Sequence, residues 1–425
     1  MDNSRQERRR RRRDRRRQNR RIKAPKHFNT VLRHIVGPTL KWLFHIEYQN
    51  RELVNTLKPP YVVLPNHGCV LDPFMVNSYL PAPIHYVVSD SNFRSKLVDF
   101  GLSLVGSIPK TKALSDLETV KNIVKIKAHN GIIGIFPEGQ STWDGSTLPL
   151  FYSTAKLLKS LKVPVVTVNV KGAFLSLPRW ARGIRRGKVT ITFSLGFTPE
   201  QLKAMSVEEI FEGMKEQLSR NEFDVQRSRM VRFLGKNKAN YLEIVLFVCP
   251  NCHSMNTLHS QGDYLTCTSC GYRVKYNSFG FFEPLNGSRH FEDLRQWNLW
   301  QTEYLEKLID SRIAETSPEP LFSDDNAKLF TGYKSLPLEK YGTGRITLYT
   351  DRIEFTAADG SADLIFPHAR IEGINVQNSE HLEFYLADTL YRLTLKSRRG
   401  NTYKWNAAVR HIQGRGRPIV REPAV

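Results

Sequence analysis

The 425-residue sequence predicts an α/β protein, with a largely parallel sheet flanked by helices, then a cysteine-rich segment and a small all-β C-terminal module. Three observations predict this fold. Short apolar runs alternate with helical patterns between residues 60 and 232, two Cys-x-x-Cys pairs follow, and short strand-like runs separated by turns fill residues 321–413. With 40% hydrophobic residues the chain can bury sizeable cores, which excludes global disorder.

Positive charge is concentrated at the N-terminus. The chain has 63 Lys and Arg against 41 Asp and Glu, and residues 1–26 alone hold 14 of the basic residues against three acidic ones. We expect this segment to be a disordered polybasic tail, because like charges repel and nothing in it can be buried. Its partner should be a polyanion, either nucleic acid or an anionic membrane surface.

An amphipathic helix is predicted behind this tail. Apolar residues recur at near-helical spacing from Phe28 to Tyr48, basic side chains fall among them, and Gly37-Pro38 predicts a kink. Such a helix suits the plane of an anionic membrane, and an ordinary surface helix packed on the core is the alternative. Because the sequence shows neither a transmembrane span nor a secretory signal, we expect a peripheral protein on the cytoplasmic face of a membrane.

Strand-like runs alternate with helical patterns over residues 27–232, and we assign this range to the α/β region. A capping box at Ser115 opens one helix and a second covers residues 148–161. Strands are expected at residues 61–64, 84–88, 132–136, 163–170 and 189–195. Ligands of such sheets bind beyond the carboxyl ends of the strands, so the loops at those ends are the candidate site.

The first of these loops carries a histidine and an aspartate five residues apart. Asn66-His67-Gly68-Cys69-Val70-Leu71-Asp72 follows the first strand directly, and Asp72-Pro73 reads as an N-cap followed by proline. Gly68 would let the loop fold back so that the Asp72 carboxylate reaches the His67 ring. A carboxylate bonded to one ring nitrogen leaves the other nitrogen free to act as a base.

Three further segments follow in order: Gly106 to Lys112, then Phe136-Pro137-Glu138-Gly139, then Val163-Pro164-Val165-Val166. With the His67 loop they resemble the four motifs of the glycerolipid acyltransferase family, that of the 1-acylglycerol-3-phosphate (lysophosphatidate) acyltransferases, also called PlsC-like. The resemblance covers roughly Phe28 to Arg232, about half of the chain.

This resemblance implies a site and a mechanism. His67 would be the general base for the acceptor hydroxyl, Asp72 would orient it, and the alkoxide would attack a fatty acyl thioester of coenzyme A or acyl carrier protein. Lys112 would hold the acceptor phosphate. The full set of implied substrate-binding residues is Asn66, Lys110, Lys112, Phe136, Pro137, Glu138 and Gly139. One departure is clear, because the family usually continues with Thr-Arg-Ser where this chain has Gln140-Ser141-Thr142.

Two other features have alternative interpretations. Cys69 is either a nucleophile beside His67 or a small buried side chain, and the resemblance favours the second because its position in the motif is variable. The basic stretch from Arg179 to Lys188 is either a solvated loop or a contact for the phosphates of lipid head groups or of coenzyme A.

The cysteine-rich segment, residues 245–284, predicts a metal site. Cys249 and Cys252 form one Cys-x-x-Cys pair, and Cys267 and Cys270 form a second one 14 residues further on. Two such pairs converge four thiolates on a tetrahedral Zn²⁺, as in a zinc ribbon, and the filled tetrahedron makes this metal structural.

The remaining modules are assigned by pattern. Residues 285–320 are expected to form a helix and a linker, and residues 414–425 a tail. Six or seven short strands and one final helix at residues 321–413 resemble a pleckstrin-homology or GRAM-like module. A small β-barrel of another kind is the alternative.

Two classes of function fit these features. The first is an O-acyltransferase that acylates a lysophospholipid on an anionic membrane, with 1-acylglycerol-3-phosphate as the preferred acceptor and another lysolipid as the alternative. The second is a zinc-ribbon protein that binds nucleic acid. The second leaves His67, Asp72 and the Phe136–Gly139 segment unexplained, and the tail has no aromatic residue before Phe28 for base stacking. We therefore expect anionic lipids, a lysophospholipid and an acyl thioester as partners, and no nucleic acid.

Overall fold

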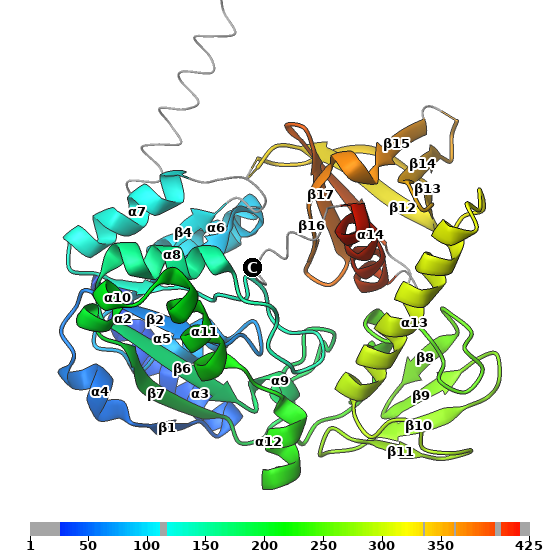
Figure 1. The fold of residues 1–425 in the computed structure, drawn as a ribbon. Helices are drawn as coiled ribbons and strands as arrows, with labels where there is room; N and C mark the ends of the chain where they lie inside the picture. The colour runs from blue at the N-terminus through cyan, green and yellow to red at the C-terminus, as the bar shows by residue number, and fades with distance from the viewer. Residues whose placement is uncertain (1–25, 111–116, 335, 361–362, 396–400, 417–425) are drawn as a thin grey trace, which may run out of the picture.

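The structure is a computed structural model that describes residues 26–110, 117–334, 336–360, 363–395 and 401–416 (Figure 1). Three parts of the sequence-based assignment lie outside these ranges: the expected polybasic tail up to residue 25, the candidate residue Lys112, and residues 417–425 of the expected C-terminal tail.

A seven-stranded sheet in the order β1-β7-β6-β2-β5-β3-β4 forms the N-terminal domain. Strands β6, β2, β5, β3 and β4 run parallel, whereas β7 is antiparallel to β6. All five predicted strands are confirmed, and the short strands β1 and β4 lie at the two edges. The strand bounds are β1 (Glu47–Gln49), β2 (Tyr61–Pro65), β3 (Ile84–Ser89), β4 (Ile108–Lys110), β5 (Ile132–Gly134), β6 (Val165–Lys171) and β7 (Thr190–Phe197).

Helices cover both faces of this sheet and bury two apolar clusters. One cluster contains Phe44, Val63 and Met75, and the other contains Val62, Ile123 and Leu158, so alternate residues of β2 serve opposite faces. The main helices are α4 (Arg51–Thr56), α5 (Asp72–Asn77), α6 (Lys96–Leu104), α7 (Leu117–Ala128), α8 (Tyr152–Leu161), α9 (Ala173–Ser176), α10 (Pro199–Ala204), α11 (Val207–Leu218) and α12 (Glu222–Arg229).

The predicted amphipathic segment is α2 (Lys26–Val31), a π-helical turn η1 (Leu32–Val36) and α3 (Gly37–Phe44). One face packs on the domain, because Leu32 and Phe44 are buried in its core. On the other face Ile35 and Trp42 are 62% and 65% exposed. The segment therefore packs as an ordinary surface helix and still presents large apolar side chains to the outside.

Two antiparallel sheets make up the rest of the chain. The cysteine-rich segment forms β8 (Leu258–Gln261), β9 (Tyr264–Cys267), β10 (Arg273–Tyr276) and β11 (Phe282–Pro284). The C-terminal module has the strand order β15-β14-β13-β12-β18-β17-β16. Its elements are β12 (Phe322–Gly332), β13 (Glu339–Leu348), β14 (Arg352–Ala357), β15 (Asp363–Pro367), β16 (Ile371–Gln377), β17 (His381–Leu386), β18 (Thr389–Thr394) and the final helix α14 (Thr402–Gly416). The all-β pattern with one closing helix is thus confirmed.

The expected helix and linker region is mainly one long helix, α13 (Leu294–Ala314), which runs between the ribbon and the C-terminal module (Figure 1). Its Trp297 Nε1 donates to the carbonyl of Val248 at 2.9 Å, and its Asn298 Nδ2 donates to Asp144 Oδ2 at 2.8 Å and to Tyr403 Oη at 2.9 Å. One continuous apolar cluster joins the ribbon, α13, the C-terminal module and the rear of the N-terminal domain. The modules therefore pack directly against one another and share one apolar core.

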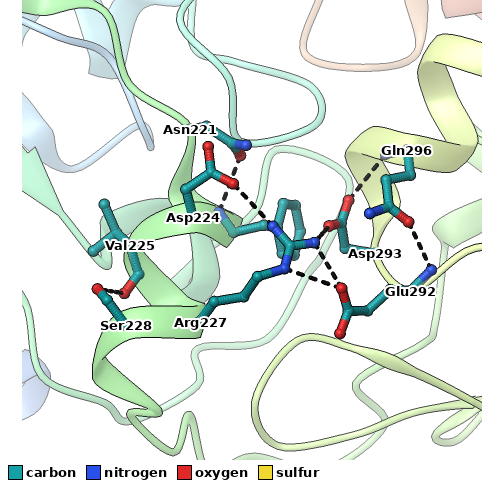
Figure 2. A network of polar contacts seen from close by, with 9 residues as sticks. Asn221, Asp224, Val225, Arg227, Ser228, Glu292, Asp293 and Gln296 are labelled. Atoms are coloured by element: carbon teal, nitrogen blue, oxygen red, sulfur yellow. Dashed lines mark hydrogen bonds and ion pairs between the residues drawn. The ribbon is translucent and has the colours of Figure 1, made fainter.

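A polar network ties α12 to the start of α13 (Figure 2). Arg227 Nη2 lies 2.8 Å from Glu292 Oε2 and also pairs with Asp293, whose side chain is only 2% exposed. Asp293 in turn caps α13 by accepting from the Gln296 backbone N–H at 2.9 Å. Burial raises the pKa of Asp293 although the Arg227 cation opposes that shift. The guanidinium therefore stabilises an otherwise costly buried carboxylate at the domain junction.

Replacing Arg227 by methionine should destabilise the protein, because it leaves the buried Asp293 without its cation. We expect the free energy of unfolding to fall by about 1–3 kcal/mol in a denaturant titration. Lys307→Met is the matched control, since the one ion pair of Lys307 among the described residues is with Glu303 on the exposed face of α13. Equal stability of the two variants would contradict this role of Arg227.

Candidate active site

The candidate residues of the His67 and Phe136–Gly139 segments lie beyond the carboxyl ends of two adjacent strands, β2 and β5. β2 pairs in parallel with β6 on one side and with β5 on the other. Asn66 and His67 follow β2, and Phe136, Pro137, Glu138 and Gly139 follow β5. Because parallel strands end at the same edge of a sheet, segments far apart in the sequence meet there.

Asp72 is the centre of the His67 loop. It is fully buried, and its Oδ2 lies 3.0 Å from His67 Nδ1 and accepts from the Cys69 N–H at 2.9 Å. A carboxylate only accepts, so Nδ1 carries the hydrogen and Nε2 is the basic nitrogen of the neutral ring. The predicted N-cap role is wrong, because Leu71 is the N-cap and Asp72 is the first residue of α5. Its carboxylate orients the histidine instead.

Backbone anchors fix the loop on both sides. The Asn66 amide bonds both backbone groups of Val170 in β6, at 3.1 and 2.7 Å. Glu138 accepts from the N–H of His67 at 2.7 Å and from the N–H of Leu148 at 2.9 Å. Burial raises the pKa of Glu138 to about 8, and the two N–H donors oppose that shift. Asn66 and Glu138 therefore position the histidine through its backbone.

The Phe136–Gly139 segment also shapes the site. The Phe136 ring packs on the His67 ring with centroids 4.2 Å apart, and the Pro137 carbonyl accepts from the Phe151 N–H at 2.9 Å. Gly139 has φ +70°, and a Cβ there would lie 2.3 Å from the Phe151 ring. Only glycine fits this position without a local shift.

Cys69 is not placed as a nucleophile. Its side chain is fully buried, and its thiol donates to Asp72 Oδ1 at 3.3 Å. Burial, together with the nearby Asp72 carboxylate, raises the pKa of the Cys69 thiol well above its usual value. A neutral thiol is a poor nucleophile, so the structure supports the buried, structural interpretation.

His67 opens into a cavity of about 480 Å³. Its lining includes apolar side chains from the loop, α5, β3 and α6, among them Val70, Phe74, Val87, Val98 and Leu102. Gln140, Ser141 and Arg179 also line it, together with Val376–Ser379 from the end of β16 and the turn that leads to β17. The C-terminal module therefore forms part of the wall, which nothing in its sequence pattern indicated.

The basic candidates separate in space. Lys110 lies with its Nζ 5.1 Å from the centre of the Phe151 ring and is not among the residues that line the cavity. Within the basic stretch Arg179 is the one basic residue among those that line the cavity. Arg185 is buried between Trp180 and Tyr276, and Arg182 pairs with Glu380 on the surface. The stretch therefore combines structural, surface and cavity-lining arginines.

The four cysteines of the ribbon converge as predicted. Their sulfur atoms all lie within 4.8 Å of one another, and the Cys249–Cys270 and Cys252–Cys267 sulfur pairs are each 3.7 Å apart. Tetrahedral Zn²⁺ with Zn–S bonds of about 2.3 Å requires sulfur atoms about 3.8 Å apart. The donor set and its geometry therefore fit a structural zinc ion.

Comparison with known proteins supports this description. The family model described as acyltransferase matches residues 45–171, and the zinc-ribbon model described as the 7 kDa subunit of DNA-directed RNA polymerase matches residues 243–278. The chain is 23% identical over 170 residues to the 1-acyl-sn-glycerol-3-phosphate acyltransferase of Saccharomyces cerevisiae. That match covers 39% of this chain and 56% of the yeast protein.

Solved structures give weaker likenesses. The lysophosphatidate acyltransferase PlsC of Thermotoga maritima superposes with a TM-score of 0.41 at 16% identity, over 47% of this chain and 79% of that one. A chain of the 8S snRNP assembly intermediate has a TM-score of 0.20 at 12% identity, over 24% and 89%. Neither superposition carries weight at such values. Residues 45–171 of this chain thus match the acyltransferase family model, and residues 243–278 match a zinc-ribbon model.

Proposed function

We propose that this protein is an O-acyltransferase that moves a fatty acyl group from an acyl thioester to the free hydroxyl of 1-acylglycerol-3-phosphate, which gives phosphatidate. The observation that carries the proposal is the His67–Asp72 pair, held at 3.0 Å beside a cavity with many apolar side chains in its lining. Such a cavity suits an amphiphile with an acyl chain. The likeness to the yeast enzyme supports the choice of acceptor.

The chemistry follows from the orientation of the imidazole. His67 Nε2 takes the proton of the acceptor hydroxyl, and the oxygen attacks the carbonyl carbon of the thioester. A C–O bond forms and the C–S bond breaks, and the departing thiolate recovers the proton from the imidazolium. Asp72 stabilises the imidazolium during this exchange. Coenzyme A and acyl carrier protein both fit as donors, and Lys110 and Lys112 stay predicted substrate contacts.

We place the working site at a membrane surface. Val70 and Val98 line the cavity and are 68% and 44% exposed, and the neighbouring Phe100 of α6 is 64% exposed. An apolar rim of this kind favours contact with lipid. None of the helices within the described residues is long and apolar enough to cross a bilayer. Anionic lipids on the cytoplasmic face would attract the polybasic residues 1–26.

His67→Ala should abolish acyl transfer without unfolding the protein. Loss of a general base costs about 10²–10⁴ in rate. We would measure transfer from oleoyl-coenzyme A to 1-acylglycerol-3-phosphate and compare thermal unfolding. Cys69→Ser is the matched control and should stay active, because a serine hydroxyl also donates to Asp72. Near-normal turnover of folded His67→Ala protein would refute the base, and an inactive but folded Cys69→Ser protein would revive the thiol.

Zinc should be present at one ion per chain, held by Cys249, Cys252, Cys267 and Cys270. Cys267→Ser should lose the metal and lower the unfolding temperature of the whole protein, because the ribbon shares its core with α13 and the C-terminal module. Elemental analysis and calorimetry test both statements. Metal-free wild-type protein, purified without chelators, would exclude the zinc site.

Deleting residues 1–26 should weaken binding to anionic vesicles in a salt-dependent manner. Each basic residue near an anionic surface contributes about 1 kcal/mol before screening, and this attraction decays within about 10 Å at 0.1 M salt. Flotation at low and high salt, with and without competing RNA, measures the effect. Binding to neutral vesicles should be almost unchanged. Equal flotation of both proteins on anionic vesicles at low salt would disprove the tether.

A further inference from the structure

The catalytic cavity contains very little charge. Of the described residues that line it, none is Asp or Glu, and Arg179 is the one with a permanent charge. The remaining side chains are neutral. Many of those from α5, β3 and α6 are apolar, and Asn77, Ser89, Gln140 and Asn378 are among the polar ones. One cation among the described lining residues, together with many apolar side chains, favours a ligand that carries both a negative group and a hydrocarbon chain.

Arg179 is held by neutral oxygens only. Its Nη1 donates to Gln140 Oε1 at 3.0 Å and to the Ser141 carbonyl at 3.1 Å, and its Nη2 donates to the Val376 carbonyl at 2.6 Å. The guanidinium also lies 4.0 Å above the Trp143 ring. These contacts use three of the five N–H bonds of the guanidinium. The other two have no acceptor among the described residues and are available to a ligand.

The Arg179 guanidinium has no negatively charged partner among the described residues. Desolvation lowers the pKa of Arg179 to about 9, because none of its described contacts is a carboxylate that would offset the loss of water. By contrast, Arg94 and Arg392, further arginines at the same module boundary, both pair with Glu383. A phosphate in the cavity would supply the missing counter-charge through charge-assisted hydrogen bonds.

Arg179 is separated from the catalytic loop by one peptide group. The peptide unit between Ser141 and Thr142 accepts from Arg179 at its carbonyl, and its N–H donates to the His67 carbonyl at 3.0 Å. In a glycerol 3-phosphate ester the reacting hydroxyl and the phosphate sit on neighbouring carbons. In acyl-coenzyme A the whole pantetheine arm separates the thioester from the nearest phosphate. A cation this close to the base therefore matches the acceptor rather than the donor.

We propose that Arg179 binds the phosphate of the acceptor and that the β16–β17 turn of the C-terminal module holds it in place. The proposal rests on the proposed function. Beyond the Val376 carbonyl, the turn contributes Ser379, whose hydroxyl donates to the Arg179 carbonyl at 3.0 Å. The C-terminal module is then part of the headgroup site, so it selects substrate rather than acting at a distance.

The test compares Arg179→Gln, Arg179→Lys and wild type in the full-length protein. KM and kcat are measured for 1-acylglycerol-3-phosphate, for 1-acylglycerol without the phosphate, and for the acyl-coenzyme A donor. Lys188→Gln is the matched control, since it removes a charge from the same basic stretch at a side chain that is 51% exposed, pairs with Glu47 and lies outside the cavity lining. Thermal unfolding reports whether each variant is folded.

Arg179→Gln should raise KM for the phosphorylated acceptor about 10- to 100-fold, because a charged hydrogen-bond partner is lost. Arg179→Lys should recover part of this loss, since it keeps the charge without the fork geometry. In Arg179→Gln, the rates with 1-acylglycerol and the donor KM should stay within about twofold of wild type, because neither involves the acceptor phosphate. The acceptor KM of Lys188→Gln should also stay within about twofold, because surface changes have small effects. If Arg179→Gln does not fold, an unchanged acceptor KM in Arg179→Lys overturns the proposal.

Two other outcomes also overturn it: an unchanged acceptor KM in folded Arg179→Gln protein, and a raised donor KM with an unchanged acceptor KM. The last would assign Arg179 to the phosphates of coenzyme A. A wild-type protein that transfers to no acceptor would instead refute the proposed function. Calorimetric binding of dodecyl phosphate against dodecanol, in wild type and Arg179→Gln, then still tests the anion site, because equal affinities in both proteins exclude it.

Discussion

The buried carboxylate of Asp72 is the interaction on which the site depends. It accepts hydrogen bonds from the His67 ring, from the Cys69 backbone and from the Cys69 thiol. An unpaired carboxylate with no exposed surface would be very unfavourable, so its three donors keep the loop in one conformation. That conformation selects the His67 tautomer and presents Nε2 to the cavity. The same three contacts of Asp72 therefore fix the position of the His67 ring and stabilise the loop.

Around this loop, backbone groups rather than side chains provide most of the rigidity. Asn66 replaces a missing strand neighbour by bonding both backbone groups of Val170, and Glu138 satisfies two N–H groups that the sheet leaves free beyond β2 and β5. Buried backbone N–H groups without acceptors destabilise the fold. Polar side chains at the strand ends therefore stabilise the structure by bonding these groups, whatever their part in catalysis. This explains why an acidic residue can be buried next to Asp72.

One shared apolar core packs the ribbon, α13 and the C-terminal module against the N-terminal domain. α13 contacts the ribbon through Trp297, the N-terminal domain through Asn298 and the C-terminal module through the apolar cluster of its inner face. The Arg227 network adds a charged link at the same junction. The ribbon and the C-terminal module bury side chains in the same apolar cluster, and the end of β16 and the following turn line the cavity.

The sequence by itself determined the local features: the strand and helix pattern, the His67–Asp72 pair, the Phe136–Gly139 turn and the four clustered cysteines. Each depends on residues close in the chain, where periodicity, spacing and glycine positions are informative. Only the tertiary structure decided which basic residue faces the cavity. The resemblance predicts an arginine where Ser141 stands, and the structure brings the Arg179 guanidinium to the carbonyl of that residue from 38 positions away. It also placed Val376–Ser379 in the lining of the cavity that His67 enters. Contacts across such distances depend on how whole modules pack, and no local pattern records that packing.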